Sequence, residues 1–247
     1  MPEAYDKAKP LPGTGARPTP GRRLYAIGDI HGRLDLLDRL LDMIQEDVAR
    51  RESAGKNVLI YLGDYVDRGL DSAGVLDRVL APLPGFDVVR LLGNHEAMMR
   101  AVLAGDQGWL ETWRHNGAAE TLESYGIVGE WGPPLIAEAR RRIPLAHRRL
   151  LDSLATCHVD GDYLFVHAGL RPGVALDRQD PEDLVWIRRA FLDSGADFGH
   201  IVVHGHSISP EVVLRPNRIG IDTGAYRSGV LTALVLENTA RGVFQTA

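Results

Sequence analysis

Five short motifs in the sequence gather aspartate, histidine and asparagine directly after apolar runs. They are GDIHG (28–32), GDYVDRG (63–69), GNHE (93–96), HAG (167–169) and HGH (204–206). Carboxylate, amide and imidazole donors suit Mn, Fe or Zn, and the absence of cysteine from the motifs argues against a structural zinc site. One such motif alone is typical of a turn, but five together predict a metal-dependent centre. The flanking glycines would let the backbone turn sharply and leave room for ions.

The apolar runs before the first three motifs are predicted to be strands of one buried sheet. They are RLYAIGD (23–29), NVLIYLGD (57–64) and FDVVRLLGN (86–94), with helices expected over 34–48 and 72–83. Apolar residues in the first helix step by three and four from Leu34 to Val48, which places them on one face. This βαβ order is typical of a parallel sheet, whose strands end at one edge. We therefore expect Asp29, Asp64 and Asn94 to meet there.

The second half of the chain is predicted to hold a helical insertion and further strands. Residues 97–157 are rich in helix-forming residues and are expected to cover one edge of the site. DYLFVHAG (162–169) and HIVVHGH (200–206) predict two strands that each end in histidine. IGIDTGAYRSGVLTALVLE (219–237) predicts a strand, a glycine turn and a strand, which together would form a hairpin.

The composition is that of one globular domain. The 247 residues are 45% hydrophobic and 25% charged, and 28 Lys and Arg against 33 Asp and Glu give a net charge of −5, so no basic field favours nucleic acid. Residues 1–21 contain five prolines and are predicted to be a flexible tail. Residues 1–21 contain no apolar run that could be the core of a signal peptide, and no later stretch approaches the ~18 apolar residues of a membrane helix. We expect a soluble, cytoplasmic protein without a membrane partner; the sequence does not indicate its oligomeric state.

In this order the motifs resemble those of the metallophosphoesterases, over about residues 22–236. The resemblance is greatest to the phosphoprotein phosphatase branch, which includes the bacterial serine/threonine phosphatases and bacteriophage lambda phosphatase, because VDRG follows the second GD. WRHNGAAETLESYG (113–126), LVWIRR (184–189) and IDTGA (221–225) resemble further stretches of the bacterial members. The resemblance implies a calcineurin-like α/β fold over residues 22–247, with two mixed sheets sandwiched between helices (αββα) and the helical insertion.

The resemblance also implies two divalent metal ions per chain, with Mn expected in vitro and Fe or Zn as alternatives. Asp29 and His31 would hold the first ion, Asp64 would bridge both, and Asn94, His167 and His206 would complete the second. In VVHGHS the Gly-His-Ser context favours His206 as the ligand, and His204 is left as a strand-end residue beside it.

The implied reaction is direct attack on phosphorus by a hydroxide that bridges the two metals, which lower the pKa of the water. His95 would be the general acid that protonates the leaving alkoxide, and Asp67 would orient it. Arg68 and Arg188 would bind phosphate oxygens through bidentate contacts, and Tyr226 would line the pocket.

Three functions are compatible with these residues, and the first is favoured. The first is a serine/threonine protein phosphatase, a phosphomonoesterase whose partner is a phosphoprotein or a small phosphate ester. The second is a symmetrical diadenosine tetraphosphatase, because LVWIRRAFL (184–192) resembles that group and Trp109 or Trp113 could stack on adenine. The third, a binding module that has lost catalysis, is disfavoured because every matched position is intact. The sequence identifies neither the native metals nor the physiological substrate.

Overall fold

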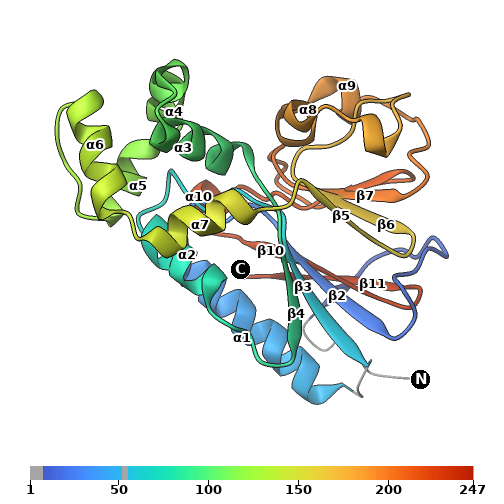
Figure 1. Ribbon diagram of the computed structural model, residues 1–247. Coiled ribbons are helices and arrows are strands. Elements are labelled where there is room, and N and C mark those ends of the chain that lie inside the picture. Colours follow the sequence, from blue (N-terminus) through green and yellow to red (C-terminus); the bar gives the residue numbers. More distant parts are fainter. Residues whose placement is uncertain (1–7, 52–54, 247) are drawn as a thin grey trace.

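Two β-sheets packed face to face form the centre of the molecule, with helices on both outer sides (Figure 1). The structure is a computed structural model that describes residues 8–51 and 55–246. The arrangement confirms the expected α/β fold, in which two mixed sheets lie between helices. None of the helices in these residues combines the length and the apolar character that spanning a bilayer requires.

The first sheet has six strands in the order β1-β11-β10-β2-β3-β4. Their bounds are Lys9–Pro10 (β1), Arg22–Ile27 (β2), Lys56–Tyr61 (β3), Phe86–Arg90 (β4), Thr232–Glu237 (β10) and Ala240–Gln245 (β11). β2, β3 and β4 are parallel to one another. Helices α1 (Leu34–Arg50) and α2 (Ser72–Leu80) make the two crossovers between them, which confirms the predicted βαβαβ order.

The second sheet has five strands in the order β5-β6-β7-β9-β8. Their bounds are Cys157–Asp160 (β5), Tyr163–Val166 (β6), Ile201–His204 (β7), Val213–Arg215 (β8) and Arg218–Gly220 (β9). β6, β7 and β9 are parallel, and the outer strands β5 and β8 are antiparallel to them. The two strands expected to end in histidine are thus neighbours at the centre of this sheet.

Successive side chains of β2 point to opposite faces of the first sheet, which explains why the sheets and helices form layers. Leu24 and Ala26 belong to the apolar cluster between the two sheets, whereas Tyr25 and Ile27 belong to the cluster that includes the buried face of α1. All four side chains are fully buried. On the far side of the second sheet, α8 (Pro181–Trp186) and α9 (Arg189–Leu192) cover a third cluster. A strand buried on both faces reads as a continuous apolar run, as observed in the sequence.

Helices make up the part of the chain between β4 of the first sheet and β5 of the second sheet. They are α3 (Asn94–Ala104), the 3-10 helix η1 (Gln107–Trp109), α4 (Leu110–His115), α5 (Ala118–Ser124), α6 (Pro133–Arg142) and α7 (Leu145–Ser153). Helices α3 to α6 form the group at the upper left of Figure 1, and α7 lies below them, above α2. The helical content expected for this region is present, and α3 begins earlier than expected, within the GNHE motif.

The flexible tail predicted over residues 1–21 is wrong for residues 8–21; residues 1–7 lie outside the described residues. Ala8 is buried and Lys9–Pro10 pair with β11, a strand that the sequence analysis did not identify. Further along, the Thr19 amide donates to Asp160 and the Arg17 amide to Asp162. The prolines suit an extended segment. This segment packs along both sheets, because β11 and the carboxylates of Asp160 and Asp162 bind it.

The hairpin predicted over 219–237 is also wrong. Its first strand is β9, which pairs with β7 in the second sheet, whereas its second strand is β10, which pairs with β2 in the first sheet. The intervening chain includes the short helix α10 (Ala225–Ser228) and carries the chain from one sheet to the other. The hairpin that does form joins β10 to β11 through a turn at Asn238, whose φ is 51°.

Replacing Asp160 should destabilise the protein, because this buried carboxylate anchors the N-terminal segment. It accepts hydrogen bonds from the Thr19 amide at 2.7 Å and from Arg22 Nη1 at 2.5 Å. We expect Asp160→Ala to lower the free energy of unfolding by about 2 kcal/mol, a fall of about 4–8 °C in Tm. Asp177→Ala, at an exposed aspartate, is the control; an equal Tm for both variants would contradict the anchoring role.

Candidate metal centre and phosphate-binding site

The five motifs meet at one edge of the two sheets, as the strand order predicts. Asp29 follows β2, Asp64 follows β3 and Asn94 begins α3 after β4, all in the first sheet. His167 follows β6 and His206 follows β7, both in the second. Contacts between them cross from one sheet to the other: the His206 amide donates to Asp29 Oδ2 at 3.0 Å, and His167 Nε2 lies 3.0 Å from Asn94 Oδ1.

Asp64 is shared by two groups of potential metal ligands. One group is His31, Asp64 and His95, and the other is Asp64, His167 and His206; within each, the donor atoms lie within 4.8 Å of one another. The two oxygens of Asp64 face opposite groups, with Oδ2 3.4 Å from His31 Nε2 and Oδ1 3.4 Å from His167 Nε2. This is the arrangement that a carboxylate between two ions requires.

The protonation states of these side chains suit cations. Burial lowers the pKa of His31, His167 and His206, which favours neutral imidazoles that can offer a lone pair to a metal ion. Burial alone would raise the pKa of Asp64, but attraction to the nearby histidines when they are protonated, His167 first, holds it below its usual range. His206 Nε2 is buried without a hydrogen-bond partner. An orphaned imidazole nitrogen beside an ionised carboxylate fits a divalent metal ion.

Asp29 and Asp222 form an acidic pair next to these groups. Both side chains are buried, and they interact directly. Burial raises the pKa of Asp222 to about 6, and burial together with Asp222 raises the pKa of Asp29. Two adjacent buried carboxyls favour a shared proton or a nearby cation. The sequence analysis missed Asp222, although it follows the end of β9 as Asp29 follows β2.

His95 is held by the carboxylate of Asp67. Its Nδ1 lies 2.6 Å from Asp67 Oδ2, and Asp67 also accepts from Trp113 Nε1 at 3.0 Å and from Thr121 Oγ1 at 2.5 Å. All four side chains are fully buried. Burial alone would lower the pKa of His95, but Asp64 and Asp67 outweigh it and raise the pKa. The Nε2 atom has no hydrogen-bond partner and lies 3.9 Å from Asp64 Oδ2, so it faces the metal groups.

Glu96, the last residue of the GNHE motif, ties two of the loops together. Its Oε1 accepts from the Tyr65 amide at 2.8 Å and the Val66 amide at 3.2 Å. Its Oε2 accepts from the Asp64 amide at 2.8 Å and the Gly93 amide at 3.1 Å. The sequence analysis gave Glu96 no role; the structure shows a buried carboxylate that fixes the loop after β3 against the start of α3.

The backbone of the site is unusual. Five residues other than glycine have positive φ here: His31 (46°), Asp64 (53°), Asp67 (72°), Arg68 (69°) and His206 (62°). This left-handed region is disfavoured for side chains with a Cβ, and such residues gather at functional sites. Gly93 is required for a different reason, since a Cβ there would lie 2.2 Å from Asp64 Oδ1.

The two arginines expected to bind phosphate lie near different groups of metal ligands. Arg68 Nη1 is 2.8 Å from His31 Nε2, and its guanidinium lies 4.9 Å from the ring centre of Tyr226. Tyr226 in turn packs edge-on against His31 at 5.4 Å. Arg188 is exposed, and its charge lowers the pKa of His167 and His206, the histidines of the other group. Each group therefore has a cation near it.

The two tryptophans proposed to stack on adenine differ in position. Trp113 is fully buried and donates to Asp67, so its faces are not accessible and this part of the expectation is wrong. Trp109 is half-buried and stacks on Trp186, with ring centres 5.7 Å apart and an angle of 15°. Trp186 lies 6.2 Å from the His206 ring. An aromatic pair thus borders the second metal group.

Comparison with known sequences identifies relatives of this chain. Residues 22–230 match the Metallophos family, described as calcineurin-like phosphoesterase. A symmetrical bis(5'-nucleosyl)-tetraphosphatase from Acidovorax sp. (strain JS42) is 36% identical over 149 residues, 60% of this chain and 44% of the relative. One from Nitrosomonas europaea is 31% identical over 187 residues, 74% of this chain and 59% of the relative. The chain thus spans about half the length of these relatives.

Solved structures share the fold. A crystal structure provisionally described as a diadenosine tetraphosphatase has a TM-score of 0.61 at 22% identity, over 98% of each chain. A serine/threonine phosphatase from Saccharomyces cerevisiae has a TM-score of 0.57 at 16% identity, over 93% of this chain and 81% of that one. The family match over residues 22–230 includes every motif of the centre, so this chain belongs to the calcineurin-like phosphoesterase family and is a metallophosphoesterase hydrolase.

Proposed function

We propose that this phosphoesterase hydrolyses dinucleoside tetraphosphates symmetrically, into two nucleoside diphosphates. The observation that carries the proposal is the 36% identity to a symmetrical tetraphosphatase over 149 residues. This reverses the order of the two substrate classes expected from the sequence, in which phosphoserine and phosphothreonine came first. The stacked pair Trp109 and Trp186, beside His206, supports the same substrate because both rings are only half-buried and aromatic rings stack on nucleobases.

The residues of the centre have complementary roles in this proposal. Asp29, His31, Asp64, Asn94, His167 and His206 would hold the two divalent ions. When bound, these ions would make a water molecule nucleophilic near neutral pH and offset charge on the phosphoryl oxygens. Arg68 and Arg188, near different groups of metal ligands, would bind the non-bridging oxygens and align phosphorus for attack. Tyr226 packs against both Arg68 and His31, and would hold that guanidinium in position.

His95 would deliver the proton to the leaving group. Its Nδ1–H is held by Asp67, so the proton available for transfer is at Nε2, the atom directed toward the metal groups. The proton would pass from Nε2 to the oxygen that departs from phosphorus. Trp113 and Thr121 are positioning residues in this scheme, because they hold the Asp67 carboxylate and touch no reacting atom.

The His95–Asp67 pair favours a second candidate substrate class, phosphoserine and phosphothreonine. A serine or threonine alkoxide is strongly basic and must be protonated as it leaves. The nucleoside diphosphate released from a tetraphosphate ends in a phosphate whose second pKa is about 6, so it can leave as an anion. A buried His95–Asp67 pair at 2.6 Å is therefore of most value for an alkyl phosphate ester.

A substrate panel with manganese-loaded protein tests the proposal. We expect kcat/KM for diadenosine tetraphosphate to exceed that for a phosphoserine peptide by about 100-fold, or roughly 2.7 kcal/mol in transition-state binding. Trp109→Ala should raise KM for diadenosine tetraphosphate by about tenfold through lost base stacking, and should leave p-nitrophenyl phosphate within twofold. Trp109→Phe is the matched control, because it keeps an aromatic face. A 100-fold preference for the peptide would favour the second candidate instead.

His95→Asn should slow hydrolysis most for substrates whose leaving group must be protonated, which would identify His95 as the general acid. We expect turnover of a phosphoserine peptide to fall by 10²–10⁴-fold, because the alkoxide loses its proton donor. Turnover of p-nitrophenyl phosphate, whose leaving group needs no proton, should fall far less. Metal content, measured by atomic emission, should stay at the wild-type level, because we assign His95 to proton delivery although its Nε2 lies within reach of the first group of metal ligands. Equal losses on both substrates would speak against His95 as the acid.

Asp64→Asn should disrupt metal binding, because it removes the charge shared by both groups. We expect fewer than two Mn ions per chain after dialysis, where the wild type retains two, and a corresponding loss of activity. Asp87→Asn, at an exposed residue of β4, is the control for the loss of one carboxylate. Full occupancy by two ions in Asp64→Asn would be incompatible with a bridging carboxylate.

A further inference from the structure

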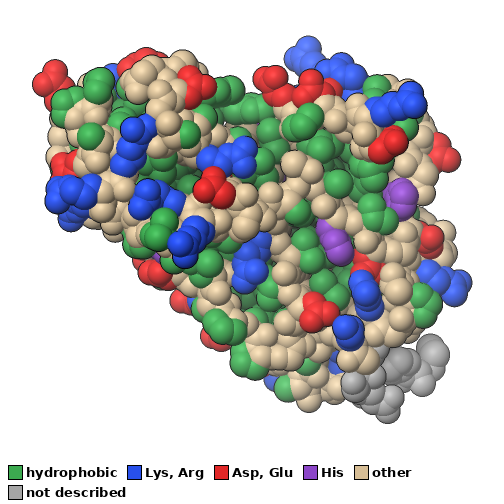
Figure 2. Space-filling model, in the orientation of Figure 1, with side chains coloured by type: hydrophobic (Ala, Val, Ile, Leu, Met, Phe, Trp, Pro, Cys, Tyr) green, Lys and Arg blue, Asp and Glu red, His purple; other side chains and the backbone are tan. Residues whose placement is uncertain are grey.

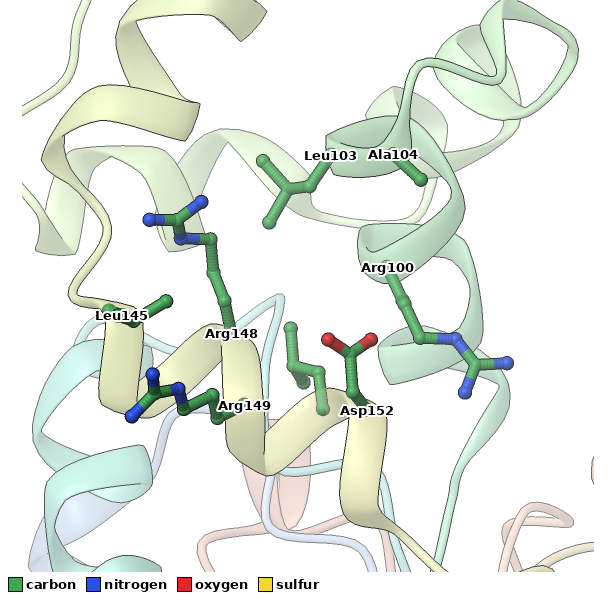
Figure 3. Close-up of a pocket in the computed structure, with 8 residues that line it drawn as sticks. Arg100, Leu103, Ala104, Leu145, Arg148, Arg149 and Asp152 are labelled. Atoms are coloured by element: carbon green, nitrogen blue, oxygen red, sulfur yellow. The ribbon is translucent and has the colours of Figure 1, made fainter.

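A separate hollow lies between α3 and α7, and none of its lining residues belongs to the metal centre (Figure 3). The volume that a water-sized sphere can occupy in it is about 200 Å³. This is less than the range of about 300–1,000 Å³ that is usual for sites that enclose a whole small molecule, so a ligand bound here would stay partly in solvent. The lining consists of three arginines, one aspartate and four small or apolar residues, among them Arg100, Arg148, Arg149, Asp152, Leu103 and Leu145.

The three arginines of this hollow have no counterions among the described residues. No side-chain hydrogen bond or ion pair joins Arg100, Arg148 or Arg149 to any of them, and Arg148 Nε is buried without a partner. Arg142, on the neighbouring α6, is instead paired with Glu138 at 3.3 Å. Basic side chains gather on this face over α6 and α7, although the net charge of the chain is −5 (Figure 2). Unpaired guanidinium groups around a hollow attract an anion, above all a phosphate.

Asp152 restricts which anions could bind in the hollow. Its carboxylate lies between Arg148 and Arg100 and has no partner of its own (Figure 3). It would repel a bare phosphate, but it can accept hydrogen bonds from ribose hydroxyls or an exocyclic amine. Leu103 points from α3 toward α7, and Leu145 is half exposed at 51%, so apolar surface is available beside the charges. One ligand that carries phosphate, hydroxyl donors and an apolar ring would satisfy all three features.

We propose that the hollow between α3 and α7 is a second ligand site, which binds a nucleoside diphosphate. The phosphates would contact Arg148 and Arg149, the ribose would donate to Asp152, and the base would pack on Leu103 and Leu145. The site goes beyond the proposed function, because its residues neither hold metal nor contact the reacting phosphate.

The first test counts ADP molecules bound to the manganese-loaded full chain by isothermal titration calorimetry. We expect Arg148→Gln/Arg149→Gln to lose one ADP per chain relative to the wild type, since each lost charged contact weakens binding by about tenfold. Arg141→Gln/Arg215→Gln is the matched control, because both arginines are exposed and lie outside the hollow. An unchanged number of ADP molecules in the first double variant would overturn the site.

The second test separates a nucleotide from a simple anion. Asp152→Asn should weaken binding of ADP at the hollow by about tenfold, because the ribose loses a charged acceptor, and should strengthen binding of inorganic pyrophosphate. If both ligands bind more tightly, the hollow recognises charge alone and the nucleoside part of the proposal is wrong. These measurements require no hydrolysis, so a negative result would not contradict the proposed activity. Conversely, a preference for the phosphopeptide in the substrate panel would not contradict this second site.

Discussion

The carboxylate of Asp64 is the group on which the rest of the site depends. Each of its oxygens faces a different histidine at 3.4 Å, so one buried charge serves both groups of metal donors. Burial of that charge is unfavourable without compensation, which bound divalent cations would supply. Any displacement of this side chain would therefore disturb both groups at once, which explains why so many contacts fix its backbone.

Those contacts hold a conformation that the chain would not adopt alone. Asp64 has a φ of 53°, and its amide is bound by Glu96, which also holds the amide of Gly93. A left-handed residue with a side chain is less stable by roughly 1–2 kcal/mol, and five such residues occur here. The buried strands on both sides keep the loop ends fixed, so the packing between the sheets offsets a strain that is localised at the centre.

The sequence allowed the strands and their polar ends to be predicted because both signals are local. An apolar run that stops at glycine and aspartate identifies a strand end wherever its partners lie. Partner choice is not local: the segment 219–237 contains two strands, as expected, but they pair with β7 and β2 in different sheets. Trp113 and Thr121 were equally hidden, since their role depends on Asp67, 46 and 54 residues away in the sequence.

Helices α4 and α5 support the residues proposed for proton delivery and phosphate binding, but not those proposed for metal binding. Metal donors come from the strand ends and the start of α3, whereas Asp67 is held by Trp113 of α4 and Thr121 of α5. The Arg68 amide donates to the Gly117 carbonyl at 3.1 Å, between those two helices. The proposed proton delivery and phosphate binding would thus depend on the helices, and the proposed metal binding would depend on the sheets. Changes in α4 and α5 could alter the leaving group that the enzyme accepts while its metal affinity stays the same.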